Sequence, residues 1–248
     1  MSRQGYWSLH EYHRLSVSSF VEEFCGWQPL IELVELAGSP REQAFISALF
    51  LTGSRVSECL LLRKNMFEVR RRERVIVCRG VPLFKRYRKI EETRDEEGRR
   101  RWITQRVEAK RKPFPISLRE PLVPYLLGWL ERLPVEDSLL FESPYKPGSA
   151  LTRFWAYRLI RDLDSRLNPE LRQRLGLDKP FVADGRLISD RLHLWLHWFR
   201  SQRASQLVAE YGFEVIDLVD FFSWESYDTA LTYSRRGWKG LASKMRRK

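Results

Sequence analysis

The sequence predicts an α+β chain that is mainly helical and carries a small antiparallel sheet. Two observations support this class. Apolar residues recur at helical spacing over most of the chain, most clearly at residues 196–208. Between residues 67 and 116 the period changes to the alternation that is typical of strands. With 248 residues, the chain is long enough for one substantial core and too short for two full domains.

The composition points to a polyanionic partner. Lys and Arg number 44 against 32 Asp and Glu, which gives a formal net charge of +12 at pH 7. Such an excess favours nucleic acid, although charge alone does not separate DNA from RNA or from a membrane surface. The motifs must therefore decide between these partners.

The cysteines indicate a reducing compartment. Cys25, Cys59 and Cys78 are odd in number and scattered, which fits core thiols better than a disulfide framework or a metal cluster. No Walker loop, dinucleotide fingerprint or zinc pattern is present, so we expect no metal and no cofactor. Without a signal-like or membrane-length apolar run, the expected location is cytoplasmic or nucleoid-associated, not secreted.

The N-terminal third predicts short helices and then one well-capped helix. Residues 17–37 contain two apolar stretches interrupted by Gly26 and Pro29, which indicates two short helices. Ser39-Pro40 then predicts a helix over residues 41–51, because Ser accepts from free amides and Pro fits the first turn. That helix should end at Thr52-Gly53, and the next should begin at Ser54.

The middle of the chain predicts the sheet. Residues 74–78, 81–84 and 102–107 have strand character, and residues 113–116 close the sheet. The intervening IEETRDEEGRRR, residues 90–101, is highly charged and is predicted to form a solvated turn or hairpin tip.

Helices dominate the chain after the predicted sheet. Residues 118–133 predict a helix that Pro134 stops. Another helix over residues 151–167 has a basic side that includes Arg158 and Arg161, suited to a DNA groove or equally to solvent. Residues 168–189 are predicted to form short helix and loop.

The last quarter presents polar groups on helices. His197 and Arg200 lie three apart on a predicted helix, so both should project from one side. A break at Tyr211-Gly212 separates it from two further helices, near residues 214–222 and 226–233. Tyr233 lies near the end of the last one.

These residues resemble the motifs of the tyrosine recombinases, the phage-type integrase family. The C-terminal pattern is His-x-x-Arg, Ala four residues later, then His or Trp with Tyr nine residues further on. Here it reads His197, Arg200, Ala204, Trp224 and Tyr233. The family usually has Leu-Gly-His in its third box, where this chain has Phe-Ser-Trp, and some members carry Trp there. The stretch TGSRVSE, with Arg55 and Glu58, is similar to the family's first motif, Thr-Gly-x-Arg-x-x-Glu.

The resemblance implies a mainly helical catalytic domain with a small antiparallel three-stranded sheet. We expect this domain at residues 20–235, after an N-terminal extension at 1–19 and before a basic tail at 236–248. The tail would dock on a neighbouring protomer or bind phosphate. A partner or a longer parent chain would supply the separate N-terminal helical domain with which most members clamp DNA.

The resemblance also implies site-specific DNA cleavage and rejoining through a 3′-phosphotyrosyl intermediate, without metal or ATP. Tyr233 would attack the phosphate that Arg55 and Arg200 grip. His197 would accept the tyrosine proton or bind the phosphate, Trp224 would donate from its indole N–H, and Glu58 would support Arg55.

Further basic residues would complete the site. The general acid would be Lys85, the lysine that best matches the family's hairpin, with Lys89 and Lys110 as alternatives. The residues expected to contact DNA are Lys89, Lys110, Arg158, Arg161 and Arg203.

The implied partner is double-stranded DNA, bound by a dimer or tetramer of the chain. Three alternatives remain open. A type IB topoisomerase-like relaxing enzyme shares the nucleophile but needs no synapsis of two sites. A noncatalytic DNA-binding protein would not need Tyr233, Arg55 and Arg200 together. An RNA-binding protein would offer aromatic stacking platforms and form no covalent adduct.

Overall fold

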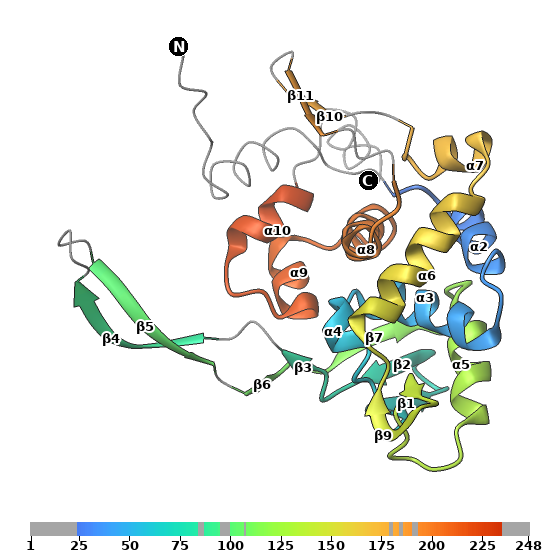
Figure 1. Ribbon diagram of the computed structural model, residues 1–248, viewed down its shortest axis with the longest axis horizontal. Coiled ribbons are helices and arrows are strands. Elements are labelled where there is room, and N and C mark those ends of the chain that lie inside the picture. Colours follow the sequence, from blue (N-terminus) through green and yellow to red (C-terminus); the bar gives the residue numbers. More distant parts are fainter. Residues whose placement is uncertain are drawn as a thin grey trace.

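A computed structural model describes residues 24–83, 87–94, 100–106, 108–178, 181–183, 186–189 and 193–234. Helices form most of the body, a small sheet lies at its lower side, and a long hairpin projects from it (Figure 1). The predicted class, mainly helical α+β, is confirmed.

The centre of the body is the helix predicted from Ser39-Pro40. α2 (Trp27–Glu35) leads into α3 (Pro40–Thr52), and the Ser39 hydroxyl accepts the Glu42 amide at 3.3 Å. Every residue from Ala44 to Thr52 is buried, because α3 packs between α5 (Val123–Arg132) and α8 (Leu196–Tyr211). α4 (Val56–Cys59) and a 3-10 turn, η1 (Lys64–Met66), come directly after it.

A three-stranded antiparallel sheet is present, as predicted, but the described parts of the strands predicted at residues 81–84 and 102–107 pair outside it. It has the order β1 (Phe67–Arg70), β2 (Val75–Cys78), β7 (Phe114–Ser117). Ile76 pairs with Ile116, and both are fully buried. β1 was not predicted, because three of its four residues are exposed and give no apolar alternation.

A long insertion separates β2 from β7. β3 (Pro82–Leu83) pairs with β6 (Ala109–Lys110), and β4 (Tyr87–Arg94) pairs with β5 (Arg100–Arg106). The β4–β5 ribbon points away from the body (Figure 1). The strand predicted at residues 102–107 is confirmed over its described part as β5. The turn or hairpin tip predicted at residues 90–101 is shorter than expected, because residues 90–94 and 100–101 belong to the two strands. Because this ribbon stands away from the core, neither of its faces needs apolar side chains. Charged residues can therefore form its strands, which are held by hydrogen bonds between backbones.

The helix predicted over residues 118–133 starts later than expected. α5 begins at Val123 with Pro124 in its first turn, where a missing amide costs nothing. Pro121 disfavours helical geometry at the residue before it, which delays the start. β8 (Glu142–Ser143) and β9 (Lys146–Ala150) then form a hairpin before α6 (Arg153–Arg166), whose cap Thr152 accepts the Trp155 amide at 3.3 Å.

Residues 168–189 contain more structure than the predicted short helix and loop. α7 (Pro169–Arg174) is the expected helix, but β10 (Phe181–Ala183) and β11 (Arg186–Ser189) form an antiparallel hairpin that was not predicted. The sequence suggested a loop here because Pro180 and Gly185, which are typical of turns, stand beside these short strands.

The three predicted C-terminal helices are confirmed as α8, α9 (Val215–Phe222) and α10 (Tyr227–Ser234). α8 is buried from Trp198 to Val208, including its polar residues, and Gly212 ends it in the left-handed conformation. α9 and α10 pack against one another, and α10 also contacts α8.

Cys59 and Cys78 are buried free thiols, as the sequence predicted, whereas Cys25 is half-buried. Burial raises the pKa of Cys78 to about 12, so the thiol stays protonated. Within the described ranges, no helix has both the length and the apolar character needed to cross a membrane.

Candidate active site

Glu58 holds Arg55 in place at the turn after α3. The fully buried Glu58 carboxylate accepts hydrogen bonds from the Arg55 backbone amide at 2.8 Å and from its Nη1 at 2.9 Å. The Arg55 side chain is 32% exposed. A buried carboxylate therefore orients a guanidinium group whose other side is open to an anion.

Gly53 allows this turn to lie close to the end of α9. It ends α3 with a φ of 55°, which L side chains rarely adopt. A Cβ there would lie 2.4 Å from Cε1 of Phe222 and 3.3 Å from Cγ of Arg203. Glycine is thus required both for the backbone conformation and for the contact between the two motifs.

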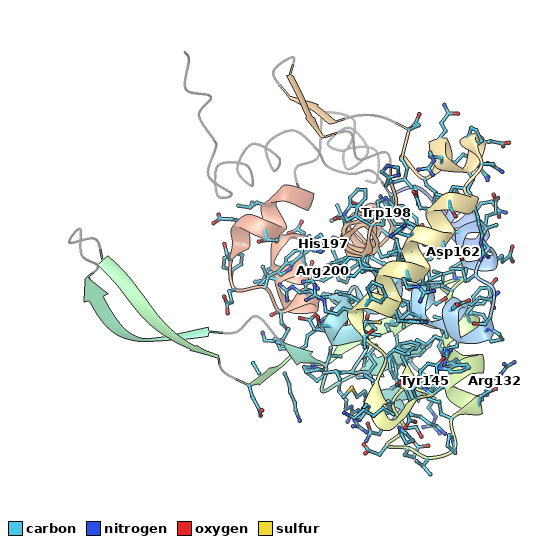
Figure 2. All side chains as sticks on the ribbon, in the orientation of Figure 1. Arg132, Tyr145, Asp162, His197, Trp198 and Arg200 are labelled. Atoms are coloured by element: carbon cyan, nitrogen blue, oxygen red, sulfur yellow. The ribbon has the colours of Figure 1, made fainter. Side chains whose placement is uncertain are left out.

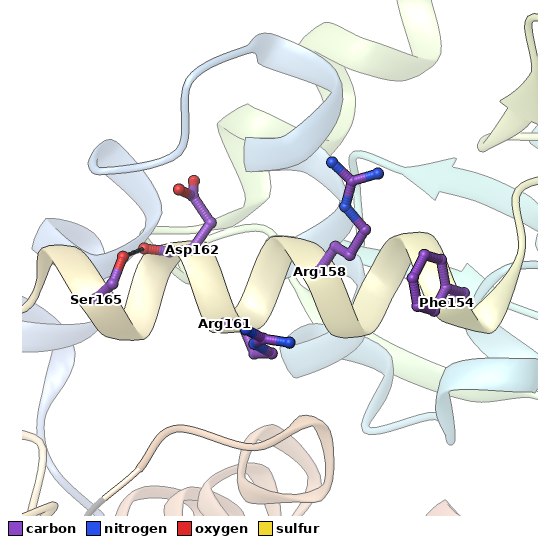
Figure 3. A pocket seen from close by; sticks show the side chains of 5 residues that line it. All are labelled: Phe154, Arg158, Arg161, Asp162 and Ser165. Carbon is purple, nitrogen blue, oxygen red and sulfur yellow. Dashed lines mark hydrogen bonds between the residues drawn. The ribbon is translucent and has the colours of Figure 1, made fainter.

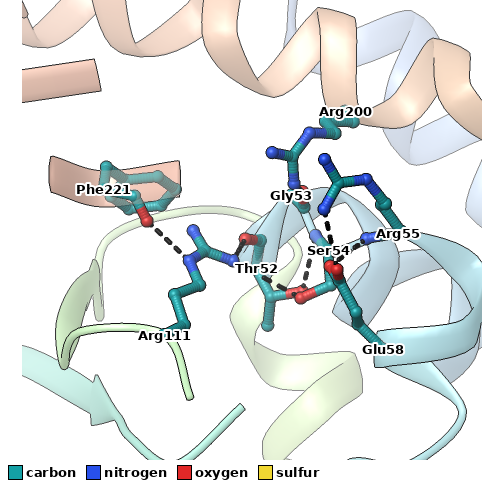
Figure 4. A network of polar contacts seen from close by, with 8 residues as sticks. All are labelled: Thr52, Gly53, Ser54, Arg55, Glu58, Arg111, Arg200 and Phe221. Carbon is teal, nitrogen blue, oxygen red and sulfur yellow. Dashed lines mark hydrogen bonds and ion pairs between the residues drawn. The ribbon is translucent and has the colours of Figure 1, made fainter. Parts of the chain in front are cut away.

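Arg200 joins the same turn from α8. Its Nη1 donates to the Gly53 carbonyl oxygen at 2.5 Å, and its side chain is buried. Its guanidinium carbon lies 4.6 Å from the Phe222 ring centroid and 5.5 Å from that of Trp224. Those two rings stack, with centroids 4.5 Å apart. Arg200 and Arg55 thus approach one turn from separate helices (Figure 4).

His197 and Arg200 lie on the side of α8 that faces α9 and α10 (Figure 2). Their exposure differs, because His197 is exposed and Arg200 is buried. Both side chains therefore point to the same side of α8, as expected, but they are not equally accessible. Arg200 is enclosed by the protein, whereas His197 lies at the surface.

Three predicted site residues lie partly or wholly outside the described structure. Tyr233 lies on α10, whose backbone is described and packs against α9 and α8, but its side chain is not described. Lys85 lies outside the described residues, and Lys89 is described only as part of the backbone of β4. Lys110, on β6, is exposed. The roles of these residues stay predictions.

Arg111 is a residue of this region that sequence reasoning missed. It comes directly after β6, is buried, and donates to the Thr52 and Phe221 carbonyl oxygens, each at 2.6 Å (Figure 4). Burial, and then the nearby Arg200 charge, lower the pKa of its guanidinium. It stands in the run KRK, where the sequence gives no sign that the middle residue is buried.

Arg203 was predicted to contact DNA, and this prediction was wrong. Its side chain is 1% exposed and forms an ion pair with the buried Glu120 at 2.7 Å. It also donates to Gln206 at 2.9 Å, while the Tyr211 hydroxyl donates to Glu120 at 2.9 Å. Arg203 occupies the next turn of α8 after Arg200, where the helix is enclosed by the core, so it serves packing and is not offered to a ligand.

The predicted basic side of α6 is present on the surface. Arg158 and Arg161 are exposed and line a shallow depression of about 400 Å³ together with Phe154, Asp162 and Ser165 (Figure 3). Asp162 forms an ion pair with Arg166 on the same helix. The depression thus presents cations beside an exposed aromatic ring, Phe154.

The chain is similar to solved structures of tyrosine recombinases. One is XerA recombinase, with a TM-score of 0.51 and 18% identity over 90% of this chain and 64% of that one. Another is the XerH site-specific recombinase bound to its difH substrate in a pre-cleavage complex, with a TM-score of 0.51 and 16% identity over 88% of this chain and 51% of that one. The chain therefore spans about half to two thirds of these proteins. No protein-family model matches the sequence, and no curated protein matches it significantly.

These similarities confirm the predicted fold. The chain has the mainly helical catalytic fold of the tyrosine recombinases, with its small antiparallel sheet. At 16–18% identity the likeness concerns the fold alone, so support for a function has to come from the site.

Proposed function

We propose that this protein is a site-specific DNA recombinase that cleaves and rejoins DNA through a 3′-phosphotyrosyl intermediate. The observation that carries the proposal is the hydrogen bond from Arg200 to Gly53. It joins motifs 147 residues apart in the sequence into one cationic site, with Trp224 beside it. A buried arginine and an oriented arginine are what a phosphodiester requires.

In the proposed reaction, the Tyr233 hydroxyl oxygen attacks the phosphorus and the bond to the 5′-oxygen breaks. His197 accepts the tyrosine proton, and Lys85 donates a proton to the leaving 5′-oxygen. Arg55 and Arg200 neutralise the charge that gathers on the non-bridging oxygens. The covalent link retains the energy of the phosphodiester, so a 5′-hydroxyl can reverse the step without ATP.

DNA binding is proposed over exposed cations of β6 and α6. Lys110 on β6 and Arg158 and Arg161 on α6 are exposed and carry charge suited to phosphate contacts. XerH is known in complex with difH substrate, and we extend DNA binding to this chain by its fold and charge. We also propose that two or four copies assemble on the DNA, since strand exchange between duplexes joins more than one cleavage site.

The test is covalent trapping on nicked duplexes. Duplex fragments of the DNA that carries the gene for this protein, with nicks placed at successive positions, are incubated with wild type and Tyr233→Phe in EDTA. A cleaved strand loses its short 5′-hydroxyl fragment, so the tyrosyl link cannot be reversed. We expect a slow-migrating, protease-sensitive band on a denaturing gel with wild type only.

Two results separate the alternatives. Relaxation of supercoiled plasmid without strand exchange between two duplexes would support the topoisomerase-like alternative. Tight duplex binding with no covalent band from any fragment would contradict cleavage and support a noncatalytic DNA-binding protein.

A further inference from the structure

Arg111 is a buried cation beside the proposed site that the proposed reaction leaves without a role. It is 3% exposed, and its two shortest hydrogen bonds go to backbone carbonyl oxygens of the protein itself. It comes from the segment between β6 and β7, whereas its partners come from the end of α3 and from α9. Its position is therefore between the element that precedes Arg55 and the element that precedes Trp224.

The hydrogen bonds of Arg111 go to the turn beside Arg55 and to the end of α9. Nη1 donates to the Thr52 carbonyl oxygen at 2.6 Å and to the Ser54 hydroxyl at 3.4 Å. Nε donates to the Phe221 carbonyl oxygen at 2.6 Å. One planar group thus bridges the turn that carries Arg55 and the last turn of α9 (Figure 4).

The aromatic surroundings fix the plane of this group. The Arg111 guanidinium carbon lies 3.7 Å from the Phe114 ring centroid and 5.0 Å from that of Phe221.

The neighbouring residue, Lys112, adds a second, weaker link to α9. The Lys112 amide donates to the Ser223 hydroxyl at 3.1 Å, and its ammonium group pairs with Asp220 at 2.6 Å on the surface.

The charge of Arg111 is not needed for a purely structural link. The buried carboxylates in the described part of the chain are Glu58 and Glu120, and these hold Arg55 and Arg203. The oxygens that Arg111 binds are neutral, and its Nη2 has no hydrogen-bond partner among the described residues. A buried, unpaired cation is costly to a fold. A nearby anion reduces this cost, and a phosphate bound by Arg55 and Arg200 would be such an anion.

We propose that Arg111 is a positioning residue for phosphodiester cleavage. By holding Thr52 and Phe221 at a fixed separation, it sets the distance between Arg55 and Trp224 and keeps Gly53 in place for Arg200. Its charge adds to the positive potential around the bound phosphate. This inference rests on the proposed function, because it assigns Arg111 to the same reaction.

The test measures single-turnover covalent adduct formation at saturating protein on the nicked duplex. The variants are Arg111→Met, which removes the charge and the hydrogen bonds, and Arg111→Lys, which keeps the charge but loses the planar bridge. Asp220→Asn is the matched control, because it breaks the exposed link to the same end of α9. Melting temperatures and affinity for an intact duplex are measured for each protein, and rates are compared below the lowest melting temperature.

We expect adduct formation to slow about 100-fold in Arg111→Met and about tenfold in Arg111→Lys, with duplex affinity changed less than about threefold. Asp220→Asn should react within about twofold of wild type. Should Arg111→Met not fold, the comparison of Arg111→Lys with Asp220→Asn decides the outcome.

Three results would overturn the inference. If a folded Arg111 variant reacts at the wild-type rate, the proposed function stands and the inference fails. A loss of rate in Asp220→Asn equal to that in Arg111→Lys would reduce Arg111 to a structural link. If wild type itself forms no adduct, both the proposed function and this inference are wrong.

Discussion

Arg200 donates a hydrogen bond from Nη1 to the carbonyl oxygen of Gly53 at 2.5 Å, which joins α8 to the end of α3. This contact uses one edge of the guanidinium group to bind the protein, while Glu58 orients Arg55 two residues after Gly53. The two cations are therefore arranged before any DNA is bound. A site organised in this way loses little entropy when it binds a phosphate.

Replacement of Arg200 should reduce cleavage far more than binding. Lys keeps the charge in Arg200→Lys but cannot bind Gly53 and a phosphate oxygen at once, so we expect adduct formation to slow about 100-fold or more. Single-turnover trapping on the nicked duplex measures this rate. Arg70→Lys, at an exposed arginine paired with Glu68 on β1, is the matched control and should leave the rate unchanged. Equal rates in the two variants would contradict a catalytic role for Arg200.

Gly53→Ala should destabilise the fold by more than its backbone conformation explains. Both Gly53 and Gly212 end helices with positive φ, but a Cβ meets nothing within 4 Å at Gly212 and lies 2.4 Å from Phe222 at Gly53. We expect Gly212→Ala to cost about 1–2 kcal/mol and Gly53→Ala about 1–3 kcal/mol more. Chemical denaturation gives both values. Equal costs would mean that the Phe222 contact accommodates a methyl group.

Glu58→Gln should weaken both stability and cleavage. The buried carboxylate accepts two hydrogen bonds from Arg55, and an amide has one acceptor oxygen for them. We expect a loss of about 1–3 kcal/mol in the free energy of unfolding. Glu68→Gln, at an exposed ion pair, should change it by about 0.5 kcal/mol or less. Normal cleavage by a destabilised Glu58→Gln protein would show that Arg55 needs no such orientation.

Tyr211 should make the fold less stable in alkali. Burial, and then the Glu120 charge, raise the pKa of its hydroxyl, so the folded protein holds a proton that the unfolded chain releases. Its contribution is complete below the unfolded pKa of about 10 and is lost as the pH rises through the higher folded pKa. The melting temperature of wild type should therefore fall more steeply above about pH 10 than that of Tyr211→Phe. Parallel curves would contradict this linkage.

The general acid can be identified with a better leaving group. Replacing the leaving 5′-oxygen by sulfur makes the leaving group a thiolate, which departs without protonation because its conjugate acid is stronger. We expect Lys85→Met to slow cleavage of the ordinary duplex about 100-fold and to cleave the sulfur-substituted duplex at the wild-type rate. Lys89→Met and Lys110→Met serve as comparisons. If the sulfur-substituted duplex restores cleavage by Lys89→Met or Lys110→Met and not by Lys85→Met, that other lysine is the general acid.

Much of the fold was predictable because local signals and burial agree. Ser39-Pro40 and Thr52-Gly53 mark both ends of α3, and Gly212 marks the end of α8, as the sequence predicted. Strand β5 was predicted, but its partner β4 and the hairpin β10–β11 were not, because pairing between backbones leaves little trace in charged or very short strands.

The residue types of the candidate site were also predictable, because motif spacing is a property of the chain itself. Arg55, Glu58, Arg200 and Trp224 stand in recognisable order, and their order says which chemistry to expect. Which arginines are buried is not encoded by spacing. Arg111 and Arg203 look like two more surface cations in a strongly basic sequence, and both are enclosed by the core.

The sequence by itself determined the helical scaffold, the excess positive charge and the set of residues able to handle a phosphate. Only the tertiary structure decided which partner each buried cation meets. Arg203 meets Glu120 and is neutralised, whereas Arg200, one turn earlier, meets the Gly53 carbonyl and two aromatic rings. The physical reason is that a guanidinium group takes its role from the partner it is buried against, and those partners lie 83 and 147 residues away in the chain.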